Sequence, residues 1–526
     1  MKLNRHRLTF LGLVLLLATS LATMIIPDIR GKTVGQVAAW SLVLSVAAGG
    51  AAIWGRPNRW FFATCAVGLL VFPFVAIARI FGRIDLMSLV FHFQFGTEGT
   101  TLTIFEVEMR EAAFAVLVLL FVAYAASNLY TLRRGGYVIA IAMLVVLNTM
   151  SLSLLHSAVR PAVESDLHQR LVQPAVTRPS VRPDIILVYL EGLERTFANR
   201  DTYGSLYEPI GVYESQGVSF TNIAQIEGTT WSLGGLVATQ CGVPILHNGL
   251  LYHNDFVDQR EFMPDRICLG DVTSAMGYRN AFVVGGDKAF GGIDHFLETH
   301  GVTEITDRSV IEDMYSAEEI AAADATGWVL GDQIVFDASL RVYDQLVVSK
   351  DPILLTIETF GPHGSTATLS RRCTADGLSV LSPNLESAVA CTLTVLDQFL
   401  DDFVLRSNGR PTVVVLLSDH LNHDKEFQSR QPYAERRNTA VFFPIGFEPQ
   451  LGRAGSVGTL PGSMIDIYPS LLAYIGRAAP DNAAGLGRSL FGSGPTILAE
   501  KGLSRLNQEL VPNAALADVL WRSEAE

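Results

Sequence analysis

Charged residues are scarce in this chain of 526 residues, where they make up 17% of the sequence. Soluble globular proteins carry about a quarter. Disordered chains and coiled coils need more charge and less apolar surface, so both classes are excluded. Positive charge is the scarcer sign, because 39 Lys and Arg face 52 Asp and Glu and leave a net charge of −13. This balance argues against a nucleic-acid partner, since such proteins concentrate Lys and Arg against phosphate.

Cysteine is also rare, with five residues and no C-x-x-C pair or zinc-finger spacing among them. Cys65 lies in an apolar segment, whereas the other four, Cys241, Cys268, Cys373 and Cys391, form an even set in the second half. Four buried free thiols are one interpretation. We favour two disulfides, which need an oxidising compartment such as a bacterial periplasm. Of the three connectivities, pairing of sequence neighbours (Cys241–Cys268 and Cys373–Cys391) is the plainest.

The apolar residues that replace the missing charge are concentrated in the first 155 residues. Five segments, each of about 20 residues, are long enough to cross the roughly 30 Å hydrocarbon layer of a bilayer: residues 8–26, 34–54, 60–80, 112–132 and 136–155. The first segment follows Lys2, Arg5 and Arg7, so a signal peptide is the alternative for it. We expect residues 1–155 to form a membrane domain of five helices. With the N-terminus inside, everything after residue 155 lies outside.

A proline-bearing stretch, residues 156–183, reads as a linker, and residues 184–526 read as one further domain. Continuous apolar, β-branched runs predict buried strands at residues 185–190, 281–284, 353–357, 412–417 and 440–443. Helical patterns occupy residues 385–405 and 464–475. Buried strands that alternate with helices indicate an α/β domain with a mostly parallel sheet covered on both faces.

Polar groups follow two of these predicted strands directly. Glu191 ends the first strand, and Asp419 with His420 ends the fourth. Ligands bind beyond the carboxyl ends of such strands. Helix N-caps or turn residues are the ordinary explanation for each group alone. Together, three titratable groups after unbroken apolar strands are costly to bury without a cation, and the ligand set suits Zn²⁺ or Mn²⁺.

A hydroxyl group for catalysis is expected in residues 227–242, EGTTWSLGGLVATQCG, which read as a turn that leads into a helix. Thr229, Thr230 and Ser232 lie near the start of this helix. The positive end of the helix dipole stabilises an alkoxide and binds phosphate, and a bound cation lowers the hydroxyl pKa further. Ordinary helix capping is the competing interpretation.

The stretches ILVYLEGLERTF, GTTWSLGGLVATQCGVP, ICLGDVTSAMGYRNAFVVGG, FLETHG, GWVLGD and LLSDH resemble a known family. They are similar to the membrane-anchored phosphoglycerol transferases of the alkaline phosphatase/sulfatase-like superfamily, in particular the osmoregulated periplasmic glucan phosphoglycerol transferases. Lipoteichoic acid synthases and lipid A phosphoethanolamine transferases are more distant relatives. The resemblance implies an alkaline phosphatase-like catalytic domain in the periplasm, anchored in the bacterial inner membrane.

Site residues follow from the resemblance position by position. The metal ligands are implied to be Glu191, Asp419, His420 and the nucleophile itself. The family's glucan branch places a threonine after a tryptophan in a GTxWT pattern, and here that pair reads Trp231-Ser232. Ser232 is therefore the implied nucleophile, with Thr230 as the alternative. One divalent cation is implied, Mn²⁺ first and Mg²⁺ or Zn²⁺ as alternatives.

Two positions depart from the family pattern. Relatives carry a phosphate-site histidine where this chain has Phe360, and a basic residue where it has Ile293. His363 lies near Phe360 and Lys288 near Ile293, and we expect these two residues to contact substrate instead. We also expect Trp231 to contact substrate.

The activity implied is transfer of phosphoglycerol from phosphatidylglycerol to a periplasmic glucan or other envelope glycan through a covalent phospho-enzyme. A phosphoethanolamine transferase acting on lipopolysaccharide is the nearest alternative, and a catalytically dead glycan- or lipid-binding receptor is another. A sulfatase is disfavoured, because residues 241–245 read CGVPI and lack the C-x-P-x-R motif that yields formylglycine.

Overall fold

The computed structural model describes residues 66–67, 164–176, 182–246, 261–511 and 513–521. The predicted membrane segments lie outside these residues, apart from positions 66–67. No helix among the described residues has the length and apolar character needed to cross a bilayer. Apart from helix α17 (Lys425–Arg430), the elements described below belong to one compact unit that contains residues 161–423 and 430–526.

An eight-stranded sheet forms the centre of this unit, in the order β11-β2-β10-β9-β1-β6-β4-β5. Its strands are β1 (Asp184–Leu190), β2 (Val218–Phe220), β4 (Arg279–Val284), β5 (Glu304–Thr306), β6 (Ile353–Glu358), β9 (Thr412–Ser418), β10 (Ala440–Ile445) and β11 (Ser456–Gly458). The five strands from β9 to β5 are parallel, whereas β10 runs antiparallel to β9 and β2. The predicted mostly parallel sheet is confirmed.

Burial on both faces explains why the three central strands are apolar throughout. Every residue of β1, β6 and β9 is buried, as expected for parallel strands covered by helices on both sides. In register, Val188 of β1 lies opposite Ile357 of β6 and Leu416 of β9. The carboxyl ends of the three strands therefore meet at one edge of the sheet.

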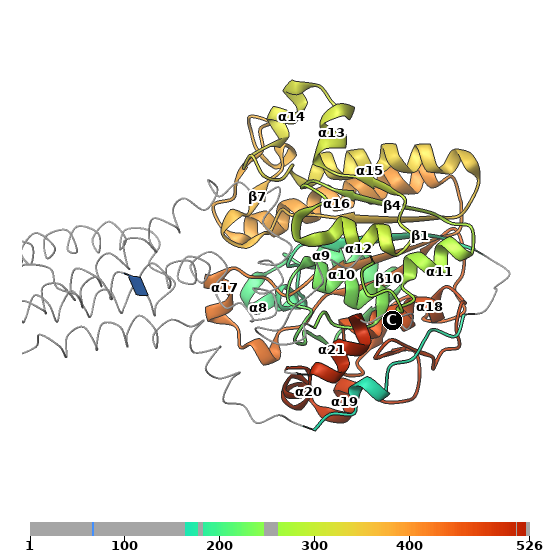
Figure 1. Ribbon diagram of the computed structural model, residues 1–526. Helices are drawn as coiled ribbons and strands as arrows, with labels where there is room; N and C mark the ends of the chain where they lie inside the picture. The colour runs from blue at the N-terminus through green and yellow to red at the C-terminus, as the bar shows by residue number, and fades with distance from the viewer. Residues whose placement is uncertain (1–65, 68–163, 177–181, 247–260, 512, 522–526) are drawn as a thin grey trace, which may run out of the picture. The chain divides into compact units, whose positions relative to one another are not determined.

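Two layers of helices cover the sheet (Figure 1). Helices α9 (Glu208–Gln216), α15 (Asp332–Leu346) and α16 (Leu385–Ser407) pack on one face, and α10 (Ser232–Cys241), α11 (Leu269–Ala275) and α18 (Ile467–Tyr474) lie on the other. The predicted helix at 385–405 extends two residues further and ends at Asn408, which adopts a left-handed conformation. The predicted 464–475 helix is a 3₁₀ turn (Met464–Asp466) followed by α18.

The remaining elements are short. The helices are α8 (Arg200–Tyr203), α12 (Ile293–Thr299), α13 (Arg308–Met314), α14 (Ala317–Ala323), α19 (Ile497–Lys501), α20 (Leu503–Leu510) and α21 (Ala514–Trp521). The strands β3 (Ile223–Ala224) and β12 (Gly462–Ser463), β7 (Thr368–Leu369) and β8 (Val380–Leu381), and β13 (Ala483–Ala484) and β14 (Gly487–Arg488) form three two-stranded sheets. Residues 164–176, within the expected linker, contact the C-terminal segment, where Val172 bridges Gly485.

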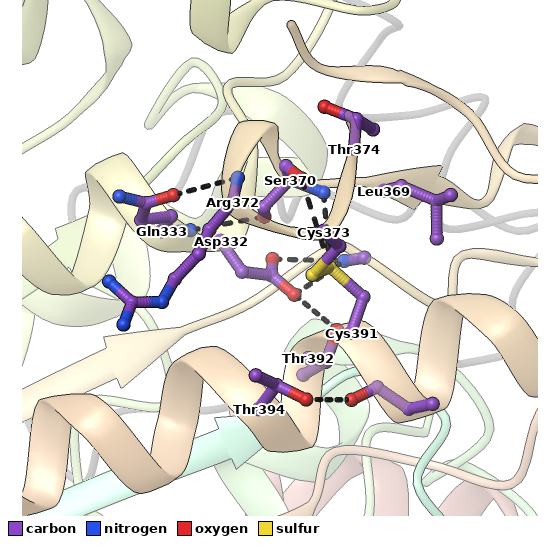
Figure 2. The surroundings of a disulfide bond; sticks show 12 residues. Asp332, Gln333, Leu369, Ser370, Arg372, Cys373, Thr374, Cys391, Thr392 and Thr394 are labelled. Atoms are coloured by element: carbon purple, nitrogen blue, oxygen red, sulfur yellow. Dashed lines mark hydrogen bonds between the residues drawn. A yellow bond between two sulfur atoms is a disulfide. The ribbon is translucent and has the colours of Figure 1, made fainter. Parts of the chain in front are cut away.

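Both disulfides have the pairing of sequence neighbours. Cys241, the last residue of α10, bonds to Cys268 at the start of α11. Cys373 bonds to Cys391 of α16, next to the buried Asp332 (Figure 2). The favoured connectivity is thus confirmed.

Candidate active site

Three neighbouring strands of the sheet end in carboxylates at the same edge. Glu191 follows β1, Glu358 is the last residue of β6, and Asp419 with His420 follows β9. All four side chains are buried. His420 Nε2 lies 3.1 Å from Asp419 Oδ2 and 3.5 Å from Glu191 Oε1. The structure therefore brings together the three residues expected as metal ligands from the strand ends, and adds a third carboxylate, that of Glu358.

Ser232 is the first residue of α10, and its side chain is half-buried. Burial raises the pKa of both Asp419 and Glu358, and the nearby Ser232 hydroxyl offsets part of the rise in each. Thr230 reaches the site through its backbone carbonyl, which accepts a hydrogen bond from His423 Nε2 at 2.8 Å. The Ser232 hydroxyl, near the carboxylates of Asp419 and Glu358, lies at the positive end of the helix dipole.

Close packing holds α10 against the end of β9. A Cβ atom at residue 235 would lie 1.9 Å from the carbonyl oxygen of Asp419, so only glycine fits there. We expect Gly235→Ala to displace Asp419, to lower the stability of the protein by about 1–3 kcal/mol and to weaken cation binding.

Thermal unfolding with and without Mn²⁺ tests this prediction, with Gly211→Ala as the matched control. Gly211 lies in α9 with open space around it, and alanine there is expected to be neutral or stabilising. Equal effects of the two substitutions would contradict the packing argument.

Four carboxylate oxygens in the site have no hydrogen-bond partner although they are buried: Glu191 Oε2, Asp419 Oδ2 and both oxygens of Glu358. Burial raises the pKa of Glu358 to about 8, helped by the charge of Asp419. Burial, with the charges of Asp419 and Glu358, also raises the pKa of Glu191 well above its usual range. Unpaired buried carboxylates are costly unless a cation compensates them, so the residues present fit a divalent cation.

The histidines around the site are neutral. Burial lowers the pKa of His420 to about 4 and that of His363 and His423 to about 3. His420 Nδ1 lies 3.0 Å from the carbonyl oxygen of Leu421. With the proton on Nδ1, Nε2 offers its lone pair toward Glu191 and Asp419, as a metal ligand requires.

A buried polar network supports the loops that carry these groups. Glu194 pairs with Arg436, whose Nε lies 2.9 Å from Glu194 Oε2, and both are buried. The side-chain amide of Asn422 donates to the carbonyl oxygens of Gly192 and Pro362 at 3.3 and 3.1 Å. Asn422 also donates its backbone N–H to Glu194. The network thus ties together the chain segments after β1, β6 and β9.

Arg436→Ala is expected to destabilise the protein by about 3–5 kcal/mol, because it leaves the Glu194 carboxylate buried without its cation. Chemical denaturation of the full chain measures the change. Arg406→Ala is the control, since its ion pair with Asp344 is exposed and such pairs contribute about 0–1 kcal/mol. A loss no larger than that of the control would contradict the assigned importance of the buried pair.

His363 and Lys288, both expected to contact substrate, differ in their surroundings. His363 packs against Trp328, with ring centroids 5.1 Å apart, and its Nδ1 lies 2.9 Å from Thr366 Oγ1. Phe360 is buried and also contacts the Trp328 ring. Lys288 instead pairs with Glu298 at 3.3 Å, with both side chains exposed.

Trp231, which was expected to contact substrate, is buried and precedes α10 directly. Ile293, one of the two departures from the family pattern, is buried as the first residue of α12.

Sequence reasoning missed Glu358. The predicted strand at 353–357 stops one residue short of it, and the rule that found Glu191 and Asp419, a polar group at the end of an apolar strand, applies equally to Glu358. Sequence reasoning also missed the support from Glu194 and Arg436, because a pair 242 residues apart leaves no local pattern.

A mostly parallel α/β sheet with buried carboxylates at the ends of three strands was compared with known protein families. Residues 183–476 match the sulfatase family model, and the chain belongs to this family. Membership of the family does not by itself make the protein a sulfatase. Cys241 of the CGVPI segment is the last residue of α10, whereas Ser232 is the first, and Cys241 is held in a disulfide. A disulfide-bonded cysteine is not free for conversion to formylglycine.

Among curated proteins, phosphoglycerol transferase I of Salmonella paratyphi B and that of Citrobacter koseri are each 29% identical over 331 residues. Each match covers 60% of this chain and 40% of the relative, so the chain spans less than half the length of these relatives.

Among solved structures, the lipoteichoic acid synthase LtaP of Listeria monocytogenes is 15% identical with a TM-score of 0.44 (61% and 78% covered). The lipooligosaccharide phosphoethanolamine transferase EptA of Neisseria meningitidis is 13% identical with a TM-score of 0.44 (90% and 95% covered).

Proposed function

We propose that this protein is a metal-dependent phosphotransferase that moves a phosphoglycerol group from phosphatidylglycerol to an envelope glycan, with Ser232 as nucleophile. One observation carries the proposal. The Ser232 hydroxyl lies at the start of α10 and faces the buried carboxylates at the ends of β6 and β9. A hydroxyl at a helix N-terminus beside a cation site suits attack on phosphorus.

Glu191, Asp419, His420 and Ser232 would hold the cation, and Glu358 adds negative charge beside them. When bound, the cation supplies positive charge that lowers the hydroxyl pKa and neutralises the phosphate. Mn²⁺ is our first choice, with Mg²⁺ and Zn²⁺ as alternatives. Each of these would satisfy carboxylate oxygens that have no partner in the protein.

In the first half-reaction, Ser232 Oγ attacks phosphorus, and the bond from phosphorus to the diacylglycerol oxygen breaks. The serine proton ends on diacylglycerol, and phosphoglycerol remains on Ser232. In the second half-reaction, an acceptor hydroxyl attacks the same phosphorus, the bond from phosphorus to Ser232 Oγ breaks, and the acceptor's proton passes to Ser232. Backbone N–H groups at the start of α10 orient the phosphate. His363 and His423, which are neutral, contribute hydrogen bonds and no charge.

The identity of the transferred group rests on the curated relatives. They are named phosphoglycerol transferase I, and they match 60% of this chain. The choice of a lipid donor rests on the five apolar segments of the first 155 residues, which support anchoring in the inner membrane with this domain in the periplasm. Because the donor stays in the bilayer, an anchored enzyme meets it in two dimensions.

Release of labelled diacylglycerol from phosphatidylglycerol by the full-length, detergent-solubilised protein tests the proposal. We expect release with Mn²⁺ and none after chelation. Phosphatidylethanolamine, offered in competition, separates the phosphoethanolamine transferase alternative. If neither lipid is cleaved by metal-loaded protein, the phosphotransfer proposal is wrong. A protein that also binds no metal would instead fit the receptor alternative.

A further inference from the structure

The hairpin β7–β8, together with the segment between its strands, exposes apolar side chains on the same edge of the sheet as the candidate site. It begins five residues after His363 and ends where α16 starts. Leu378, Val380 and Leu381 are 49%, 37% and 58% exposed. Scattered exposed apolar residues are ordinary, but three within four positions form an apolar patch at the free edge of this hairpin, as at a contact surface.

The described part of the chain covers β7 but leaves β8 exposed, because Thr368 of β7 is buried whereas both residues of β8 are exposed. Val380 and Leu381 are consecutive residues of β8, and consecutive strand residues point to opposite faces. Both are exposed. Strand β8 is therefore the free edge of the hairpin and exposes apolar side chains on both of its faces, whereas β7 lies against the protein.

The hairpin is held firmly, so its apolar side chains stay exposed. Thr368 pairs with Leu381 and Leu369 with Val380. Ser379 donates its backbone N–H to Ala322 at 2.7 Å. The disulfide from Cys373 fixes the intervening segment to α16 (Figure 2). Apolar groups on a fixed frame lose little conformational entropy when they are buried in a contact.

Positive charge lies beside the apolar patch. Arg372 is exposed, and its side chain points away from the disulfide (Figure 2). Arg371 is half-buried and lies 3.9 Å from Asp337. Arg372 is therefore the positive group exposed beside the leucines, since Arg371 is paired with Asp337; Asp376 of the same segment is also exposed. Aliphatic groups with flanking basic residues are the composition of surfaces that insert shallowly into anionic bilayers.

We propose that the hairpin patch, formed by Leu378, Val380, Leu381 and Arg372, rests on the surface of an anionic phospholipid bilayer and places the candidate site at the lipid headgroups. The proposal rests on the proposed function for the identity of the lipid donor. Aliphatic side chains offer a glycan no hydrogen bonds, which argues against the acceptor as occupant. The sequence order, from β6 through His363 into the hairpin, makes the patch continuous with the site.

Fluorescence quenching in lipid nanodiscs tests the contact without any turnover. The full chain with Cys65→Ser receives an environment-sensitive NBD label at Leu381→Cys, in nanodiscs of phosphatidylcholine and phosphatidylglycerol that carry doxyl groups on their acyl chains. The control is Leu405→Cys. Leu405 is 79% exposed near the end of α16, toward the edge of the sheet opposite the site.

We expect a blue-shifted, strongly quenched label at residue 381 and an unquenched label at residue 405. Arg372→Gln should weaken the contact about fivefold when phosphatidylglycerol is present and leave it unchanged in pure phosphatidylcholine. Equal quenching at residues 381 and 405, or none at residue 381, would overturn the proposal. Burial of the label without lipid quenching would also overturn it, because a protein or second copy would then cover the hairpin.

A kinetic measurement separates this inference from the proposed function. Leu378→Ser with Leu381→Ser should raise the apparent KM for phosphatidylglycerol in bilayers and leave that for a dispersed short-chain analogue unchanged. If the wild-type protein cleaves neither lipid but the label at residue 381 is quenched, the phosphotransfer proposal fails and the bilayer contact stands. If the wild-type protein cleaves the lipid but the label at residue 381 is not quenched, the phosphotransfer proposal stands and the bilayer contact fails.

Discussion

Ser232→Ala is expected to lower diacylglycerol release by a factor on the order of 10⁴–10⁶, the range seen when an enzyme loses its nucleophile. The hydroxyl is lost without a change in helix packing, because Ser232 is the first residue of α10 and is only half-buried. Melting temperature should therefore change little while activity disappears. Initial rates with labelled phosphatidylglycerol and saturating Mn²⁺ measure the effect.

Two further variants make the Ser232 prediction specific. Ser232→Thr keeps the hydroxyl, and the resemblance to enzymes with threonine at this position predicts retained activity. Thr230→Ala removes the alternative nucleophile and should leave most of the activity, since Thr230 meets His423 through its backbone. A Thr230→Ala enzyme as inactive as Ser232→Ala, or an active Ser232→Ala enzyme, would contradict the assignment.

Metal-free protein is expected to lose stability as pH rises from about 6.5 to about 8. The folded protein keeps a proton on Glu358 up to a pKa of about 8, whereas the unfolded chain loses it near 4.5. The folded state therefore binds more protons in this window, and stability falls by roughly 1.4 kcal/mol per pH unit for each such carboxyl. Below pH 6.5 the neutral histidines act in the opposite direction, because only the unfolded chain protonates them.

Bound cation should cancel this loss, so the rise in melting temperature on adding Mn²⁺ should grow from pH 6.5 to pH 8. Glu358→Gln is the matched variant. Without the titrating carboxyl, the metal-free protein should be more stable at pH 8 than the wild type, and its gain from Mn²⁺ should be smaller. Parallel pH profiles for metal-free wild type and Glu358→Gln would show that Glu358 does not bear the buried charge.

The central fold followed from local pattern because its signal is strong. Strands β1, β6 and β9 are buried on both faces and read as unbroken apolar runs, and the long helix α16 was located to within two residues. Strands β2 and β11 of the same sheet escaped prediction. They have three residues each, too few for a period to show, and they are specified by pairing with β10 and with each other.

The candidate site was predictable where function coincides with a strand end, as at Glu191, Asp419 and His420. Tertiary contacts decided the rest. Lys288, which was expected to contact substrate, forms an exposed ion pair with Glu298, and its substrate contact stays a prediction. The network of Glu194 and Arg436 joins distant segments, and its residues look like ordinary surface charges in the sequence. Side-chain direction and long-range pairing were therefore the missing information.

Peptide mapping by mass spectrometry after brief reaction tests the central claim most directly. The full-length, Mn²⁺-loaded protein is mixed with phosphatidylglycerol that carries a label in its headgroup, without acceptor, and is quenched in acid. We predict labelled phosphoglycerol on Ser232, formed together with diacylglycerol and absent from Ser232→Ala. Label on Thr230, or diacylglycerol release with no labelled peptide at any time, would contradict a covalent intermediate on Ser232.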